Sequence, residues 1–257
     1  MSTEKITSYQ NEAKFGFAEI VEYLKKLPQN SCVLEIGCGS GFLLNKLKNK
    51  FPSLRFIGVE PSNVYFNYSS IQNFKNSFKI IKNNYENIKF DEKFDFIFSV
   101  NVLEHTKNEK LILKKIYHDL KKNAESVILC PNYSFPFESH FHIPIIINKK
   151  ISYFLFKKYI TNQEQVRGYK GLWDSINFVR HKSLKNNAIQ VGFEVSSDFN
   201  ITSRMVERLF SDPAFRKRNR IFLLINKFVR LVYIMKILKL KVFKYKLPYM
   251  KLILKKF

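Results

Sequence analysis

The segment VLEIGCGSG, residues 33–41, is the part of the sequence best suited to hold a ligand. Glycines at 37, 39 and 41 allow a sharp turn and a close approach to a bound molecule, where any Cβ would collide. Glu35 stands just before this turn, and Glu60 ends the next apolar run, FIGVE. A carboxylate in the second position can accept hydrogen bonds from both ribose hydroxyls of a nucleoside. The pattern therefore favours a nucleoside ligand.

The spacing around the glycines narrows the kind of nucleoside. A dinucleotide site would show GxGxxG, and a kinase-type phosphate loop would end in GK[ST], but this segment has GxGxG with no lysine after it. Glu35 would repel a pyrophosphate and attract the α-amino group of a methionine moiety. These features favour S-adenosylmethionine as the cofactor.

The elements that must position these residues alternate between short apolar runs and amphipathic stretches, which is typical of βα units around a parallel sheet. Helices are expected to begin near Gly41, Ser62 and Asn108, and HKSLKNNAIQVGFEV predicts a helix that ends at Gly192 and runs into a strand. Residues 131–178 are rich in proline, aromatics and histidine, and we expect an irregular cap there. The expected core strands are Cys32–Ile36, Arg55–Val59, Phe78–Ile81, Phe94–Val100, Ser126–Cys130 and, at the end of the chain, Tyr249–Leu254.

With these motifs the sequence resembles the class I S-adenosylmethionine-dependent methyltransferases, particularly the small-molecule type similar to ubiquinone and sugar methyltransferases. The resemblance is carried by VLEIGCGSG, FIGVEPS, NNYENI, FDFIFSVNVLEHT and LKKNAESVILCPN, within residues 30–130. It implies an α/β fold with a Rossmann-like, seven-stranded methyltransferase sheet, an inserted cap and a basic C-terminal helical region. The implied division is a cofactor-binding core (1–130), an acceptor cap (131–178), a core helix and strand (179–203), a basic amphipathic helical region (204–246) and a last core strand (247–257).

The resemblance also implies which residues contact the cofactor. Glycines 37, 39 and 41 would line the methionine and ribose, and Glu35 would organise the amino acid end. Glu60, followed by Pro61, would bind the ribose. The segment NNYENI would supply Asn84 and Tyr85 beside adenine, although relatives usually have Asp where Asn84 stands. Asn101 would lie beside the methionine carboxylate or sulfonium.

Histidines that follow the fourth and fifth strands are the candidates for activating an acceptor, since methyl transfer requires an aligned nucleophile and a destination for its proton. His105 comes directly after the fourth strand, and both general base and loop packing stay open for it. His140 and His142 follow the fifth strand. Because they are two residues apart they would point to opposite faces of an extended segment, so we expect at most one to reach the acceptor.

A metal at this place is the alternative that the resemblance leaves open, because some relatives bind a divalent cation through an acid-x-x-Glu-His arrangement in this loop. Here Asn101 stands in the first position, which leaves Glu104 and His105 with help from His140 or His142. Because the acid is missing, we expect no metal.

The charge is concentrated in one part of the chain. The 257 residues carry 44 Lys+Arg and 21 Asp+Glu, a net charge of +23, and 46% hydrophobic residues exclude wholesale disorder. Residues 204–257 contain sixteen of the Lys/Arg and two acids, while the longest apolar runs are too short for a membrane span. We expect residues 204–246 to dock on an anionic membrane surface, with RNA the less favoured partner. A core or dimer helix whose lysines reach out to solvent stays open as the alternative.

The expected function is methyl transfer, most favourably to an oxygen of a small molecule, a sugar or a lipid-linked glycan. The competing hypotheses are an RNA methyltransferase and a catalytically silent, membrane-associated subunit that retains the fold. Three cysteines form no CxxC pair, and the first thirty residues contain no apolar h-region. We therefore expect a cytoplasmic protein, docked on the inner face of the membrane where residues 204–246 bind lipid.

Overall fold

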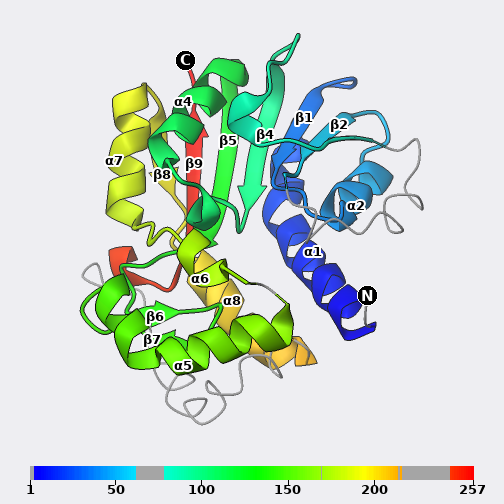
Figure 1. The fold of residues 1–257 in the computed structure, drawn as a ribbon. Helices are drawn as coiled ribbons and strands as arrows, with labels where there is room; N and C mark the ends of the chain where they lie inside the picture. Colours follow the sequence, from blue (N-terminus) through cyan, green and yellow to red (C-terminus); the bar gives the residue numbers. More distant parts are fainter. Residues whose placement is uncertain (1–2, 62–77, 169, 214, 216–243) are drawn as a thin grey trace.

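A computed structural model describes residues 3–61, 78–168, 170–213, 215 and 244–257. Its centre is a seven-stranded sheet with the strand order β3-β2-β1-β4-β5-β9-β8 (Figure 1). The five neighbouring strands β3, β2, β1, β4 and β5 pair in parallel, whereas β9 is antiparallel to both β5 and β8. The predicted Rossmann-like methyltransferase sheet is therefore confirmed. Its strands are β1 (Cys32–Ile36), β2 (Arg55–Val59), β3 (Lys79–Ile81), β4 (Phe94–Val100), β5 (Leu120–Pro131), β8 (Glu194–Ser197) and β9 (Tyr249–Lys255).

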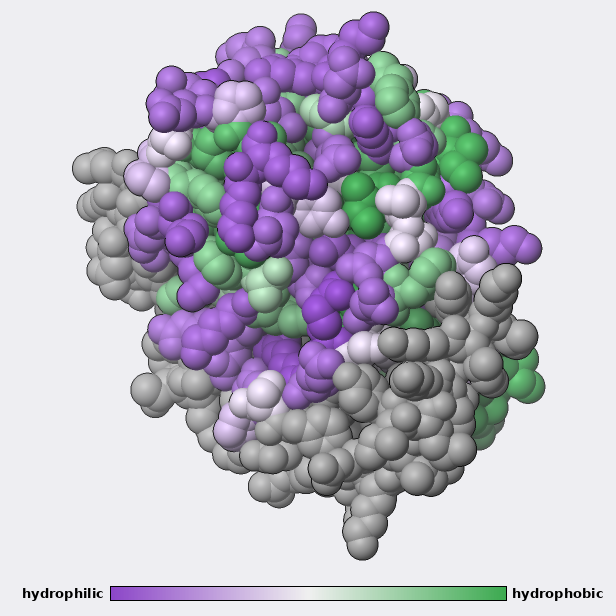
Figure 2. Space-filling view, turned by 180° about the vertical axis from the view of Figure 1, so that it is seen from behind, coloured by the Kyte–Doolittle hydropathy of each residue, from purple (hydrophilic) through white to green (hydrophobic). Residues whose placement is uncertain are grey.

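Helices cover both faces of this sheet. On one face α4 (Glu109–Asp119) and α7 (His181–Val191) bury Ile112, Ile116 and Leu184 against the strands. On the other face α1 (Thr3–Leu24), α2 (Phe42–Lys50) and α8 (Ile201–Ser211) pack through a second apolar cluster. The central strand β1 is buried on both sides, which explains why all its residues except Glu35 are apolar. Seen from behind, the described surface is mostly hydrophilic, with hydrophobic residues in small separate groups (Figure 2).

Two boundaries around the fifth strand differ from the prediction. The helix predicted to begin near Asn108 ends at Asp119, and the chain enters β5 at once with Leu120. The strand is correspondingly longer than the predicted Ser126–Cys130, because its first half continues past an irregularity in the pairing with β4. The helix predicted from Ser62 lies outside the described residues. The helix-to-strand prediction at Gly192 is confirmed, with that glycine in the left-handed conformation at φ 112°.

The cap, residues 131–178, is more regular than the sequence indicated. It contains a short hairpin of β6 (Phe137–Glu138) and β7 (Ile143–Pro144), the 19-residue helix α5 (Lys149–Arg167) and the single turn α6 (Leu172–Ser175). The expectation of an irregular segment was wrong for α5. It rested on the composition of the whole segment 131–178, in which proline and aromatic residues outside the helix obscured the helical stretch. Asn148 caps α5 by accepting a hydrogen bond from the N–H of Ile151 at 3.0 Å. The cap has its own core around Phe141, Ile160 and Trp173.

The C-terminal region is only partly described, and residues 216–243 lie outside that part. Helix α8 begins at Ile201, three residues before the predicted start of the basic helical region. Several cations of this region turn inward, since Arg204, Arg208, Lys251 and Lys256 all bind acids or backbone carbonyls of the core. Their charge is therefore not available for docking. Among the described helices, none combines the length and the apolar character that a membrane span requires.

Candidate active site

The glycine turn after β1 lies at the carboxyl edge of the parallel strands. Gly37, Gly39 and Gly41 all have φ between 52° and 77°, a conformation that disfavours other residues. A Cβ on Gly37 would lie 2.3 Å from the Cγ2 atom of Val102, whereas a Cβ on Gly39 would meet nothing within 4 Å. Gly37 therefore permits close packing of the loop after β4, and Gly39 borders open space where a ligand has room.

The two acids predicted for the cofactor site lie next to this turn. Glu60 accepts a hydrogen bond from the N–H of Gly39 at 2.9 Å, which fixes the carboxylate beside the open side of the turn. Glu35 is 3% exposed, and its Oε2 atom has no hydrogen-bond partner. Burial, and then the negative charge of Glu60, raise the pKa of Glu35 well above its ordinary value. A cation placed between the two acids would relieve both effects.

The predicted adenine segment divides into an exposed and a buried part. Asn84 is exposed at the start of the 3₁₀ turn η1 (Tyr85–Asn87), and Pro61 is exposed directly after Glu60. The Tyr85 side chain is 3% exposed, and its hydroxyl donates to Asp119 at 2.8 Å. This corrects the expectation for Tyr85. Its ring is part of the core, so any contact with adenine would come from its main chain.

Asn101 follows β4 and is held by residues of the strands β5 and β9. It has a left-handed backbone with φ 58°, its N–H donates to the carbonyl of Leu129 at 2.9 Å, and its Oδ1 atom accepts a hydrogen bond from the hydroxyl of Tyr249. Tyr249 begins β9 and is 6% exposed. The last strand of the sheet thus fixes the residue that the sequence places beside the methionine group.

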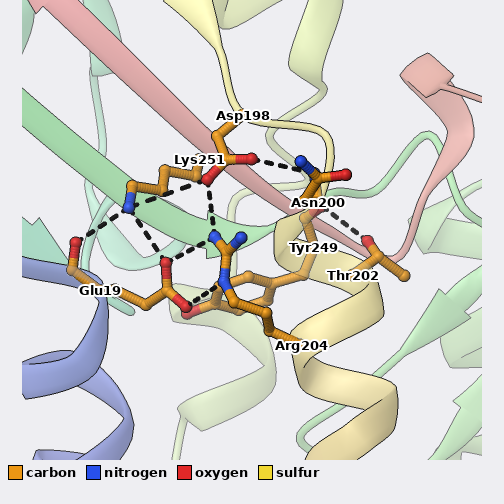
Figure 3. Close-up of polar contacts among 7 residues, drawn as sticks. All are labelled: Glu19, Asp198, Asn200, Thr202, Arg204, Tyr249 and Lys251. Atoms are coloured by element: carbon orange, nitrogen blue, oxygen red, sulfur yellow. Dashed lines mark hydrogen bonds and ion pairs between the residues drawn. The ribbon is translucent and has the colours of Figure 1, made fainter.

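An ion-pair network ties the two ends of the chain together beside Tyr249 (Figure 3). Glu19 of α1 is 4% exposed and receives two hydrogen bonds from Arg204 of α8, at 2.6 and 2.7 Å. Lys251 of β9 donates to the same carboxylate at 3.0 Å and to the Glu19 carbonyl at 2.9 Å, and Arg204 also binds Asp198 at 2.6 Å. Because these charges are mutually paired, α1, α8 and β9 are held as one unit beside the site.

Three potential metal ligands or proton acceptors meet where the cap covers the loop after β4. Glu104 and His105 belong to the 3₁₀ turn η2 (Leu103–His105), and His140 comes from the loop between β6 and β7. Each offers one ligand atom within 4.8 Å of the others, and the two imidazole rings are 5.0 Å apart edge to face. The structure thus brings two of the three predicted histidines together. His142 is outside this group, and its ring lies 6.4 Å from that of Phe137.

The hydrogen bonds of the two histidines assign the same tautomer to both. Ser175 donates its hydroxyl proton to the carbonyl of Leu172 at 2.7 Å, so at 3.2 Å it accepts from the Nδ1–H of His105. The Nδ1 atom of His140 lies 2.6 Å from Glu138, an acceptor when ionised. Although burial favours its neutral form, hydrogen bonds from His140 and Phe141 hold the pKa of Glu138 below its ordinary value. Nε2 is therefore the basic nitrogen of both rings.

Glu104 is an unusual neighbour for these histidines. It is fully buried, and neither carboxylate oxygen has a hydrogen-bond partner. Burial raises its pKa to about 7, while burial and then the nearby His140 lower the pKa of His105 to about 4. Buried, unpaired carboxylates are costly and are retained mainly where they act on a ligand.

Two acids were missed as members of this centre. The sequence indicated only a metal-ligand role for Glu104, and it indicated no role for Glu138. Glu138 lies in the short strand β6 and also accepts from the N–H groups of His140 and Phe141 at 3.0 and 2.7 Å. The spacing Glu138-x-His140 could have indicated a carboxylate that orients an imidazole, but only the folded loop brings that pair to Glu104.

A family model described as "Methyltransferase domain" matches residues 9–197, which is most of the chain and contains the glycine turn, Glu35, Glu60 and the cluster of Glu104, His105 and His140. The chain belongs to the class I S-adenosylmethionine-dependent methyltransferases. It is 27% identical over 226 residues to an uncharacterized protein of Mycobacterium tuberculosis, a match that covers 80% of this chain and 72% of that protein. It is also 30% identical to (S)-coclaurine N-methyltransferase of Papaver somniferum, over 44% of this chain and 33% of the relative.

Solved structures share the fold of this methyltransferase at low sequence identity. Phosphoethanolamine N-methyltransferase 2 of Haemonchus contortus, in complex with S-adenosylmethionine, superposes with a TM-score of 0.60 at 17% identity. The match covers 93% of this chain but only 52% of that protein, so the chain spans about half its length. The cyclopropane synthase MmaA2 of Mycobacterium tuberculosis gives a TM-score of 0.56 at 14% identity, covering 93% of this chain and 82% of that one. The methyl donor of the family is S-adenosylmethionine.

Proposed function

We propose that this methyltransferase transfers the methyl group to a hydroxyl oxygen of a small molecule, a sugar or a lipid-linked glycan, at the centre formed by Glu104, His105 and His140. The observation that carries the proposal is the convergence of three groups able to accept or hold a proton where the cap meets the carboxyl edge of the sheet. A hydroxyl must lose its proton during methylation, whereas a neutral amine can accept the methyl group first and lose a proton later. Such a cluster therefore favours an oxygen acceptor.

On the donor side, we assign the cofactor to the glycine turn and its two acids. Bound S-adenosylmethionine supplies a methyl group already activated by the positive charge on sulfur. Glu35 would pair its lone Oε2 atom with the α-amino group, and Glu60 would accept from the ribose hydroxyls while it holds the N–H of Gly39. Asn101, fixed by Tyr249, would lie beside the methionine end. Asn84 would accept from the adenine amino group.

On the acceptor side, the residues of this chain orient the oxygen and take its proton. The C–O bond forms as the C–S bond breaks, so the oxygen must be aligned behind the methyl group and its proton must leave at the same centre. The Nε2 atom of His140, or that of His105 as the weaker base because of its lowered pKa, receives that proton, since the Nδ1 atoms are engaged with Ser175 and Glu138. Ionised Glu138 would stabilise the cation formed on His140.

The same three residues fit a divalent cation better than the sequence indicated. Two imidazole Nε2 atoms and a carboxylate form a common ligand set, and a histidine ligand usually gives its other N–H to a carboxylate, as His140 gives it to Glu138. The unpartnered oxygens of Glu104 are the structural observation in favour. A cation held there would occupy the two Nε2 atoms, so it is an alternative to proton transfer to His105 or His140. It would act as a Lewis acid that lowers the pKa of the acceptor hydroxyl, whose proton would then leave to water.

Product analysis with isotopically labelled cofactor tests the proposal. The full chain is incubated with methyl-labelled S-adenosylmethionine and fractionated small-molecule, glycan and lipid pools, and the new bond is located by NMR. An O–CH₃ bond supports the proposal, and a methyl group on nitrogen, carbon or RNA contradicts it. Substituting His105→Gln or His140→Gln should lower turnover at least tenfold without changing cofactor affinity, whereas the exposed His118→Gln should leave both unchanged.

The basic region 204–246 supports two further readings of the same fold. We propose that it contributes to docking on an anionic membrane; its residues 216–243 carry nine Lys/Arg and no acid but lie outside the described part of the structure. The RNA methyltransferase alternative would use the same charge on phosphates. A silent subunit would show no methyl transfer to any pool. The labelling experiment distinguishes these two alternatives from the proposed function: methyl label on RNA supports the first, and no label in any pool supports the second.

A further inference from the structure

The cap exposes an unusual share of the large apolar side chains that the described surface presents. Nine such residues are exposed in the described part of the chain, and five of them lie between residues 147 and 166. They are Ile147 at 80% exposure, Phe154 at 79%, Leu155 at 56%, Tyr159 at 42% and Val166 at 74%. Exposed apolar residues scattered singly are normal, but a concentration in one short segment indicates an interaction surface.

Helix α5 explains how these residues come to share a surface. Its inner side packs Phe156 and Ile160 onto the cap core. At 100° per residue, Leu155, Tyr159 and Val166 fall along one edge of the helix. Phe154 lies about 100° away from Leu155 on the outer side, with Lys158 between them. In Figure 1, α5 runs along the side of the cap that faces away from the sheet. The helix is therefore amphipathic, with an apolar edge that the cap core does not use.

The charges of the same helix are all of one sign on its exposed side. Lys150, Lys157 and Lys158 are exposed. The one acid of α5, Glu164, turns inward and accepts hydrogen bonds from the N–H groups of Gly171 and Trp173, at 3.1 and 2.8 Å. An apolar edge flanked by lysines without an exposed acid is the composition of helices that lie in the interface of a bilayer.

We propose that the α5 outer face, consisting of Phe154, Leu155, Tyr159, Val166 and the lysines 150, 157 and 158, docks on an anionic lipid bilayer. A second copy of the chain, with its net charge of +23, would be repelled from this cationic face. Nucleic acid would satisfy the lysines but leave aliphatic Leu155 and Val166 without a partner. Anionic lipid headgroups and acyl chains satisfy both kinds of residue at once.

This inference goes beyond the proposed function and does not depend on which atom is methylated. Its consequence is geometric, because α5 belongs to the insertion that also supplies His140. Docking through α5 would bring the acceptor centre close to the membrane surface.

Vesicle co-sedimentation of the full chain tests the proposal. We expect binding to vesicles of phosphatidylcholine mixed with phosphatidylglycerol and much weaker binding to phosphatidylcholine alone. The triple variant Lys150→Ala/Lys157→Ala/Lys158→Ala should lower the partition coefficient by about fivefold for each lysine removed. Its control, Lys114→Ala/Lys122→Ala/Lys182→Ala, removes the same charge from exposed lysines outside the cap and should lower it far less.

The apolar contribution is tested separately. Phe154→Ser/Leu155→Ser/Val166→Ser should reduce binding at least about tenfold, whereas Leu111→Ser/Ile189→Ser, at exposed positions of α4 and α7, should not. All substituted side chains are exposed, and unchanged circular dichroism and cofactor affinity would verify folding. Equal losses in test and control variants, equal binding to neutral vesicles, or no vesicle binding by the wild type would overturn the proposal.

A site-specific probe separates docking through α5 from docking through the basic region. The native cysteines 32, 38 and 130 are all buried, so Phe154→Cys can be labelled selectively with a polarity-sensitive dye. Its emission should shift to the blue on anionic vesicles, while a dye on Ile189→Cys should not respond. If the protein sediments with vesicles and the dye at position 154 does not respond, or responds only to RNA, the α5 outer face is not the docking surface.

Discussion

Replacing Glu104 with glutamine should make the metal-free protein more stable. The wild-type carboxylate is fully buried, and neither oxygen has a hydrogen-bond partner, so ionisation inside the fold is unfavourable. Glutamine keeps the shape of the side chain and cannot ionise. The expected gain is the opposite of what a core substitution normally gives.

The size and the pH range of the gain follow from the shifted pKa. Burial raises the pKa of Glu104 from 4.5 to about 7, and a shift of this size corresponds to about 3 kcal/mol. Below pH 4.5 the carboxyl is neutral in both folded and unfolded chains, and the penalty is absent. Between pH 4.5 and 7 the unfolded chain has released the proton that the folded chain retains, so the penalty grows as pH rises through this range. Above about pH 7 both chains have released the proton, and the penalty is constant.

Urea unfolding in EDTA, from pH 4.5 to pH 8, measures this difference. The unfolding free energies of wild type and Glu104→Gln should coincide at the acid end and separate by about 3 kcal/mol at pH 8. The exposed Glu86→Gln serves as the control and should change the free energy by less than about 0.5 kcal/mol. A variant that is less stable than wild type, or a difference independent of pH, would refute the reasoning. Added Zn²⁺ should stabilise only the wild type if the centre holds a cation.

Three further substitutions test the donor side and the framework. Glu60→Ala should weaken S-adenosylmethionine binding at least tenfold in calorimetry, about 1.4 kcal/mol, and an unchanged affinity would contradict the proposed ribose contact. Gly37→Ala should lower the unfolding free energy by about 2–3 kcal/mol, because the new Cβ collides with the loop after β4. The new Cβ of Gly39→Ala meets open space, so this substitution should lower it by only about 1 kcal/mol. Equal losses would contradict this packing. Lys251→Met should lower the unfolding free energy by about 2–3 kcal/mol, because it leaves the buried Glu19 with one partner fewer. Lys25→Met, which breaks an exposed pair, should lower it by less than about 0.5 kcal/mol. Equal effects would argue against the network.

The sheet could be predicted from the sequence because its information is local. Each core strand is a short apolar run beside a turn or an amphipathic helix. The glycines of VLEIGCGSG stand where the backbone adopts a positive φ, which other residues disfavour. The positions of the two acids proposed to bind the cofactor were predictable for the same reason, since Glu35 lies within its strand and Glu60 directly after one. Tyr85 was harder, because only the position of Asp119, thirty-four residues away, decides that its ring turns inward.

The acceptor centre could be predicted only in part, because it depends on contacts between distant segments. His105 and His140 were both candidates, but nothing in the sequence distinguishes His140 from His142. The folded loop does so through Glu138, which holds the imidazole of His140 and two backbone N–H groups at once. Similarly, Arg204 and Arg208, two cations of the region expected to dock, are used inside the fold against acids of α1.

The division of the centre between core and cap has a consequence for the search for the acceptor. Glu104 and His105 come from the loop after β4, but His140 belongs to the cap, and the cap residue Ser175 fixes the tautomer of His105. The N–H of Asn177, also from the cap, donates to the carbonyl of Glu104. The centre therefore exists only while the cap is packed on the sheet, whereas the donor site is built entirely from the core. Cofactor binding can persist in a chain whose cap is displaced, so it does not by itself report a competent acceptor centre. Acceptor screens thus need the intact cap, and, where α5 docks on lipid, the bilayer as well.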